Sequence, residues 1–480
     1  MPIDSTHRSY HDWYEKAHKN RLVAEGEEAV KFAGEKFLPR SKGLTKHEYE
    51  AYRDRGMFFG ATKRTIFTLV GSIFRRDPIL AIPTELDYLI KDVDLYNTHL
   101  FSFIKEATEE VITVGRHGVL VDWDNEAKRA KACSYVGENI INWKVSKING
   151  VEQLEWVVLC EHVETYDDDP FEPEIVKQYR LLYLDNGVYT VNLYTPKGKK
   201  DYELSESITP TIMGRTLDYI PFVIINTTRV GAGCEDAIIN DLANVNLHHY
   251  RFSCDLAHGL HFTSLPTPWI AGLDVLPDVE QRRSEPMRIG SQSAWLLPQG
   301  AATGMLEFSG QGIGAISKHL EEAERKMAIL GARILDKPMV MSETAEAASI
   351  RTQSETAALV NVVDAVDRAF TKILRWIAVW HNQDPASIDI EINRDFINYK
   401  MNSLDVVNLI SAWQSGAIDS EALFYNLQQG ERLAPDVDKE AYIKMLDEKL
   451  VVPEPEEGEA QEEPSRIATG FNAEVEPTKG

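Results

Sequence analysis

The chain has 480 residues, of which 43% are hydrophobic and 26% charged, so it is long enough to bury a large core and too long for a single one. Its formal net charge is −24, with 75 acidic against 51 basic side chains, which opposes phosphate binding over most of the surface. These figures indicate a globular protein and argue against a tight nucleic-acid binder, although not against a protein that touches DNA without holding it.

Neither a signal peptide nor a membrane span is predicted. The N-terminus carries charges and aromatic side chains, and no later stretch reaches about 18 consecutive apolar residues. The four cysteines, Cys133, Cys160, Cys234 and Cys254, form no CxxC pair, a pattern typical of reduced thiols. We therefore expect a soluble chain, made in the cytosol, with no membrane partner.

The first 115 residues are predicted to be mostly helical. Residues 25–59 hold two helical segments separated by Pro39, and apolar positions recur at helical spacing through residues 62–78. A further helix over residues 100–118 ends at a glycine, and the apolar run Val119–Val121 that follows it indicates a buried strand.

The middle of the chain changes to a strand pattern. Three segments, 154–166, 179–194 and 219–228, are rich in β-branched and aromatic residues. The dipeptide Asn186-Gly187 within the second segment is a strong hairpin signal. We expect these segments to form one antiparallel sheet.

Two long helices are predicted next, over residues 236–262 and 311–335, with a Pro- and Gly-rich stretch of short strands and loops between them. In the second helix, apolar residues separated by three and four predict a narrow packing seam. The seam consists of Ile313, Ile316, Leu320, Ala323, Met327, Leu330 and Ile334. The other faces of this helix are densely charged.

A third long helix is predicted over residues 342–380, and its two halves differ. The C-terminal half carries an apolar stripe that requires a core, whereas residues 342–356 are small, polar and acidic. Beyond it the sequence predicts two short helices within residues 403–433 and a disordered acidic tail after residue 450.

The sequence contains no motif for catalysis or nucleotide binding. It has no GxxxxGK[ST] loop, no complete dinucleotide-binding fingerprint, and no GxSxG, HExxH or kinase motifs. We therefore expect a non-enzymatic assembly protein with no catalytic residues, no metal and no cofactor.

Two weaker metal hypotheses remain. Cys254, His258 and His261 share a helix face at ligand spacing, but ordinary packing of that face is favoured because no further ligand accompanies them. The acidic residues Asp122 and Asp124, and the run Asp167–Asp169, are magnesium candidates for a nuclease, and solvated turns are again the favoured interpretation.

Several blocks of the sequence carry a family resemblance. They are residues 26–40, 49–78, 109–123, 135–143 and 242–272, followed by the helix over 342–380. In this order they resemble the bacteriophage portal proteins of a group catalogued only as a domain of unknown function. Residues 403–430 are similar to the helix, glycine turn and helix that end tailed-phage portals.

The resemblance implies an α+β, mostly helical subunit of the portal type. The implied regions are an N-terminal wing of helices and antiparallel sheet (1–235), a first stem helix (236–262), a clip (263–310), a second stem helix (311–335), a tunnel loop (336–345), a long helix with a return to the wing (346–400), a short helical crown (401–450) and a disordered acidic tail (451–480).

The resemblance further implies a ring, usually a dodecamer, at one vertex of a capsid, through which double-stranded DNA is packaged and ejected. The expected partners are further copies of the chain, the terminase large subunit, a head-tail adaptor, the major capsid protein and a scaffold protein, with DNA passing non-specifically. The chain would be made in the host cytoplasm and act in the virion. The rival interpretations are another head-tail connector or minor capsid protein and, less favoured, a metal-dependent DNA enzyme.

A ring gives the small, acidic half-helix a role. Twelve helices about 10 Å wide would leave an opening of about 28 Å, which a duplex about 20 Å across would pass. Small and acidic residues would keep this opening wide and repel phosphates. The candidate lining residues are Ser342, Glu343, Thr344, Ala345 and Glu346. The alternative is a solvent-exposed helix start.

The seam on residues 311–335 also has two interpretations. It packs either between paired stem helices of a ring or within an ordinary intramolecular helical hairpin. The basic residues of this helix, Lys318, Arg325, Lys326 and Arg333, are candidates for facing the channel and touching phosphates.

Overall fold

The computed structural model describes residues 2–148, 150–166, 171, 173–198, 201–263, 267–271, 300–306, 311–332, 345–394, 396, 403–430, 432–433 and 437–450. It divides into two compact units, Met1–Ile397 and Asn398–Gly480. The first unit combines helices with antiparallel sheets, so the fold is α+β, as predicted.

The first unit begins with helices, as the sequence predicts. In chain order these are α1 (Arg8–Glu25), α2 (Glu27–Phe32), η1 (Gly34–Lys36), α3 (Lys46–Arg55), α4 (Ala61–Ile73), η2 (Thr84–Leu86), α5 (Tyr88–Lys91) and α6 (Leu100–Val114). Their ends follow local chemistry, since Thr45 and Glu48 form a capping box at the start of α3. Gly115 ends α6 with a φ of 86°, a left-handed conformation that favours glycine. The short strand β1 (Ile79–Ala81) lies between α4 and η2 and pairs with β14 (Asp389–Glu391).

Two antiparallel sheets follow. The three-stranded sheet has the order β11 (Phe222–Asn226), β2 (Arg116–Asp124), β3 (Arg129–Val136). The five-stranded sheet has the order β4 (Ile140–Ile148), β5 (Val151–Thr165), β6 (Glu174–Asp185), β7 (Val188–Pro196), β8 (Tyr202–Ile208). The turn η3 (Gly137–Asn139) joins β3 to β4, and the ribbon β9 (Thr211–Ile212) and β10 (Arg215–Thr216) follows β8. The hairpin predicted at Asn186-Gly187 is confirmed, because both residues adopt positive φ between β6 and β7.

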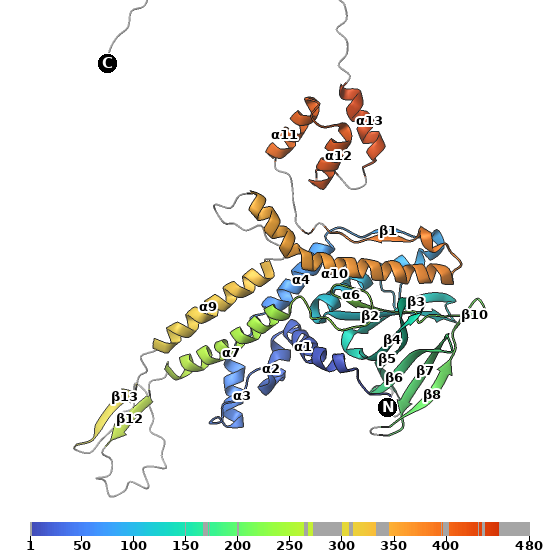
Figure 1. Cartoon of the computed structure of the whole chain (residues 1–480). Helices are drawn as coiled ribbons and strands as arrows, with labels where there is room; N and C mark the ends of the chain where they lie inside the picture. Colours follow the sequence, from blue (N-terminus) through green and yellow to red (C-terminus); the bar gives the residue numbers. More distant parts are fainter. Residues whose placement is uncertain are drawn as a thin grey trace, which may run out of the picture. The chain divides into compact units, whose positions relative to one another are not determined.

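The three-stranded sheet is a middle layer (Figure 1). Val119 and Val121 of β2 belong to the core shared with the helices, whereas Leu120 between them belongs to the core shared with the five-stranded sheet. A strand with apolar neighbours on both faces reads as a continuous apolar run, which is why Val119–Val121 is recognisable in the sequence.

The prediction of one sheet from segments 154–166, 179–194 and 219–228 is wrong for the third segment. β11 pairs with β2, about a hundred residues earlier in the chain, and not with β7 or β8. All five residues of β11 are buried, so this strand requires cover on both faces. The edge of the five-stranded sheet, where β8 is almost wholly exposed, does not provide that cover.

Long helices complete the first unit. They are α7 (Asn240–Thr263), α9 (Gln311–Ala332) and α10 (Ala345–Trp380), with strands β12 (Thr267–Ala271) and β13 (Ala302–Leu306) between α7 and α9, and η5 (Pro385–Ser387) before β14. The C-terminal half of α10 is buried along the predicted stripe, which includes Leu359, Val366 and Phe370. Arg394, after β14, ties the returning chain to α10 by ion pairs with Asp364 (2.9 Å) and Asp367 (2.8 Å).

The second unit is a small helical cluster of α11 (Ser403–Gln414), α12 (Ser420–Gln429) and α13 (Lys439–Leu450). The prediction of two helices here missed α13. Its Leu446 joins Trp413, Leu423 and Leu427 in a core of its own, so the third helix covers an apolar face that two helices leave open. The predicted acidic tail lies outside the described residues.

Candidate functional site

Helices α7 and α9 lie side by side and extend away from the sheets of the first unit (Figure 1). They contain 24 and 22 residues, so each is about 33–36 Å long. Strands β12 and β13 pair antiparallel between them, with Trp269 opposite Gly304. A Cβ at position 304 would lie 2.8 Å from Nε1 of Trp269, so glycine is needed for the indole to lie across β13. The chain thus runs out along α7, turns through a hairpin region and returns along α9.

The seam predicted on the second of these helices lies on the face of α9 that is turned away from solvent. Leu320, Ala323 and Met327 are buried, and Ile313, Ile316 and Leu330 flank them in half-buried positions. Ile313 lies beside Gly259 of α7, 3.8 Å from the position that a Cβ there would occupy. The seventh seam residue, Ile334, lies outside the described residues. In the described part, the centre of the seam is buried within one chain, while Ile313, Ile316 and Leu330 stay partly exposed.

A cluster of imidazoles joins the two helices at mid-length. The Nε2 atoms of His248 on α7 and His319 on α9 are 2.8 Å apart, and Nε2 of His249 lies 3.2 Å from Oε1 of Glu324. The ring of Phe252 packs against both His248 and His319, with centroids 4.7 and 4.5 Å apart. A cavity of about 200 Å³ opens beside this cluster. The sequence analysis did not single out this cluster, although the dipeptide His248-His249 within a predicted helix was a visible signal.

The N-terminal half of α7 is anchored in the body of the unit. Asn246 is fully buried, accepts a hydrogen bond from the Thr62 hydroxyl (2.9 Å) and donates one to the carbonyl of Phe59 (2.7 Å). Gly56, at the end of α3, leaves space for Cys254, because a Cβ there would lie only 2.2 Å from the Cys254 Sγ. Asn246 thus holds the N-terminal half of α7 beside α4, and Cys254 in the C-terminal half packs against α3.

The metal hypothesis for Cys254, His258 and His261 is not supported by their surroundings. Cys254 is buried, and burial raises the pKa of its thiol to about 11, whereas a metal ligand must lose that proton. The His258 ring packs against Tyr52, and Nε2 of His261 lies 3.2 Å from the guanidinium of Arg55. Among the residues that the structure describes, no group of three potential ligands has the geometry to hold a metal ion.

The acidic candidates have local roles where they are described. Asp124 accepts hydrogen bonds from the backbone amides of Glu126 and Ala127 in the β2–β3 turn and forms an ion pair with Lys131. These bonds, of which the one from Ala127 acts most strongly, lower the pKa of Asp124. Asp122, two residues earlier, accepts from the amide of Trp123. Asp167–Asp169 lie outside the described residues.

Helix α9 carries both basic and acidic side chains outside its seam. Lys318, Arg325 and Lys326 are exposed, and the helix carries an equal number of acidic residues, Glu321, Glu322 and Glu324. Arg333 lies outside the described residues. The described face is therefore neutral overall, in a chain whose net charge is −24.

The candidate lining residues fall at the edge of the described chain. Ser342, Glu343 and Thr344 lie outside it, while Ala345 and Glu346 form the first turn of α10, whose backbone alone is described there. The small, acidic half of the predicted helix is therefore helical from Ala345 onward, and the placement of its side chains stays a prediction.

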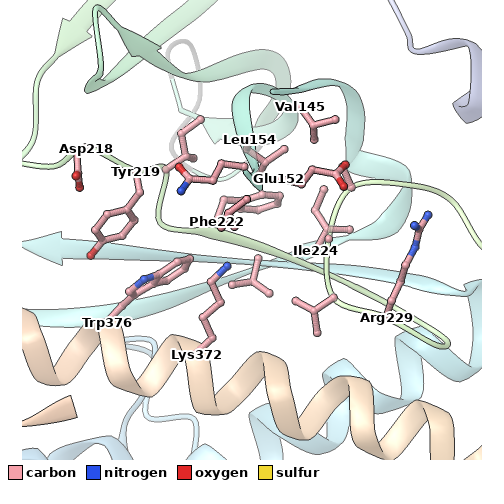
Figure 2. A pocket seen from close by; sticks show the side chains of 17 residues that line it. Val145, Glu152, Leu154, Asp218, Tyr219, Phe222, Ile224, Arg229, Lys372 and Trp376 are labelled. Atoms are coloured by element: carbon pink, nitrogen blue, oxygen red, sulfur yellow. The ribbon is translucent and has the colours of Figure 1, made fainter. Parts of the chain in front are cut away.

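A second concave site, which the sequence did not indicate, lies between α10, β11 and the β4–β5 hairpin. It is a groove of about 550 Å³, and Figure 2 shows Lys372 and Trp376 extending into it from α10. Trp376 stacks on Tyr219 with ring centroids 5.2 Å apart, and the Lys372 Nζ lies 4.8 Å from the Trp376 ring. Desolvation lowers the pKa of Lys372.

One known family matches the part of the chain that contains α7, α9 and α10. Residues 239–381, from the start of α7 to the end of α10, match the model of a family described as a domain of unknown function, DUF4055. None of the curated proteins matches the sequence. No described helix is long and apolar enough to cross a bilayer.

Solved structures of low sequence identity are similar to this chain over most of its length. One is the neck of a native gene transfer agent particle with C12 symmetry, at 12% identity and a TM-score of 0.36, with 82% of this chain and 98% of that chain covered. Another is the neck of an empty particle with C6 symmetry, at 12% identity and 0.36, covering 78% and 90%. A third is an HK97 family phage portal protein from Corynebacterium diphtheriae, at 11% identity and 0.32, covering 70% and 92%. These TM-scores lie below 0.5, so the similarity carries no argument about function.

Proposed function

We propose that this chain is the subunit of a phage portal, a ring through which double-stranded DNA enters and leaves a capsid. The observation that carries the proposal is the paired arm of α7 and α9. Its base is anchored in a larger α+β body, and its far end carries the β12–β13 hairpin. Such an arm has one buried seam within the subunit and leaves its charged faces for neighbouring copies and for a channel.

We assign the regions of a portal subunit to the chain as the family resemblance implies them. The body made of residues 1–235 is the wing, α7 and α9 are the stem, and residues 263–310, with β12 and β13, are the clip. Residues 336–345 are the tunnel loop, α10 with the chain up to residue 400 is the long helix and wing return, and residues 401–450 are the crown.

Charge supports a conduit rather than a DNA-binding protein. The three exposed cations of α9, Lys318, Arg325 and Lys326, are matched in number by three acidic residues that lie between Lys318 and Arg325. Tight binding would arrest moving DNA, because each neutralised phosphate releases counterions and deepens the interaction. A balanced stem face and an acidic lining at Glu343 and Glu346 avoid that arrest.

The partners follow from this arrangement. Further copies of the chain close the ring. The family resemblance implies twelve copies, a number that the mass of the assembly measures directly. The terminase large subunit, which supplies the ATPase that the sequence lacks, and later a head-tail adaptor dock on the clip. The major capsid protein and a scaffold protein surround the wing.

The oligomeric mass of the purified chain tests the proposal. Mass photometry combined with negative-stain images is expected to show rings of about twelve copies with a central hole wide enough for a duplex of about 20 Å. A monomer or dimer that persists when scaffold and capsid proteins are added contradicts the ring. Cleavage of DNA that depends on a divalent metal favours the rival enzyme.

A second experiment tests the channel face. Assembled rings carrying Lys318→Gln, Arg325→Gln or Lys326→Gln are compared in DNA binding over a series of salt concentrations. Each cation that touches phosphate contributes about one unit to the salt slope. Every subunit of the ring loses the same cation, so the slope is expected to flatten by about one unit for each copy of that residue that touches phosphate. Glu321→Gln on the same helix is the matched control and is expected to leave the slope unchanged or to raise it. If none of the cation variants flattens the slope, these residues do not face DNA.

A further inference from the structure

The contact between His248 and His319 is a hydrogen bond that depends on a proton. The Nε2 atoms are 2.8 Å apart while the ring centroids are 5.1 Å apart, so the two rings meet almost head to head through these nitrogens. This is the geometry of an N–H···N hydrogen bond, in which one imidazole donates and the other must be neutral in order to accept. The contact therefore exists with no more than one of the two rings protonated.

The neighbours of this pair disfavour a second positive charge. From α7 come Arg251 and His249, and from α9 come Lys326, which lines the cavity with both rings, and Glu324, which is engaged by His249. From α1, Lys19 donates to Oδ1 of Asn244, one turn before His248 (2.6 Å). Helices α3 and α4 contact this pair of helices at other positions. On α3, Arg55 contacts His261 and Tyr52 donates to Asp255. On α4, Thr62 donates to Asn246 and Thr65 lies beside Gly331. No carboxylate of the described chain is bonded to either His248 or His319.

We propose that His248 and His319 form an acid-sensitive latch between α7 and α9, closed while at least one imidazole is neutral and released when both are protonated. Two protonated rings lose the hydrogen bond and repel each other at short range. The adjacent contact between Nε2 of His249 and Oε1 of Glu324 needs no neutral imidazole as acceptor, so it is not part of the latch. Acid therefore loosens α9 at His319 and leaves it held at Glu324, so the pair of helices shifts without coming apart.

The direction of the pH dependence follows from linkage. Burial lowers the pKa of His248 below its ordinary value of 6.5, and the neighbouring imidazoles and cations lower it further. A group that binds its proton less readily in the folded state makes that state less stable as the pH falls. The latch is thus fully closed above the ordinary imidazole range and is lost as the pH falls from 6.5 through the depressed pKa of the folded protein.

Hydrogen exchange on the full-length chain tests the latch. Peptides covering residues 244–252 and 315–326 are followed at about pH 7.5 and about pH 5.5, with labelling times scaled for the intrinsic exchange rate. In the unmodified chain we expect exchange of these peptides, after scaling, to be about tenfold faster at the lower pH, since one hydrogen bond is lost and one repulsion gained. Peptides of the five-stranded sheet serve as the internal reference.

Substitutions separate the latch from a merely structural contact. Glutamine is neutral at both pH values and can donate or accept, so His319→Gln and His248→Gln are each expected to reduce the tenfold change to less than about twofold. His47→Gln, at an exposed position on α3, is the matched control and keeps the full change. Lys326→Met removes one neighbouring positive charge, which favours protonation of the pair, and is expected to raise the pH at which the latch opens. The proposal is overturned if the unmodified chain shows no local change, or if the two glutamine variants respond to pH as strongly as it does.

Discussion

The anchoring of α7 on α3 predicts an unusually costly glycine substitution. In Gly56→Ala the new Cβ would lie 2.2 Å from Sγ of Cys254, 3.1 Å from its Cα and 3.2 Å from its Cβ. Rotation of the thiol relieves only the first of these contacts, so the backbones of α3 and α7 must also move apart. The φ of Gly56 is −66°, which alanine adopts readily, so the whole cost arises from crowding.

Overpacking of a well-packed core costs about 1–3 kcal/mol, and we expect Gly56→Ala near the upper end because backbone atoms are involved. The free energy of unfolding is measured by urea denaturation, followed by tryptophan fluorescence and far-UV circular dichroism. Gly43→Ala is the control, since a Cβ at that position meets nothing within 4 Å. Its effect should stay within about 0.5 kcal/mol of zero or be slightly stabilising.

A double-mutant cycle sharpens the test. Cys254→Ala removes the sulfur that lies nearest to the added methyl group, so the cost of Gly56→Ala should be smaller in that background. Additive effects of the two substitutions would mean that the sulfur is not the obstacle. Stability of Gly56→Ala equal to that of Gly43→Ala would refute the close approach of α3 to α7.

Three further outcomes are expected. Burial opposes ionisation of Glu161, but hydrogen bonds from Arg180, Tyr135 and Gln178 outweigh it and lower the pKa of this carboxyl below its ordinary 4.5. The stability that the ionised carboxyl contributes is present above pH 4.5 and is lost as the pH falls through its pKa in the folded protein. In urea denaturation between about pH 5 and 3, Glu161→Gln should therefore lose less unfolding free energy with falling pH than the unmodified chain does. Met327→Ala, in the buried seam of α9, should cost about 2–4 kcal/mol by the same method, and a loss below 1 kcal/mol would show that the seam is not packed. A chain ending at residue 397 should keep the thermal transition of the first unit in circular dichroism, because the second unit has its own core; a chain that fails to fold would contradict the division into two units.

The local periodicity of apolar residues in the sequence predicted much of the fold. The spacing of Leu320, Ala323 and Met327 predicted the buried face of α9, and the apolar stripe from Leu359 onward predicted the buried half of α10, because helical spacing by itself decides which side chains share a face. Asn186-Gly187 predicted a hairpin for an equally local reason, the positive φ that its turn requires. The lack of nucleotide-binding and catalytic motifs, together with the acidic net charge, led to the expectation of an assembly protein.

Contacts between distant segments were decided only by the tertiary structure. The apolar pattern of β11 is compatible with several partners, and burial on both of its faces selected β2. His248 and His319 lie 71 residues apart, and Gly56 and Cys254 still farther, so no spacing in the sequence brings them together. Helical and strand periodicity fix which face of an element is apolar, but the choice of the facing element depends on the shapes of two surfaces that meet only after the chain has folded.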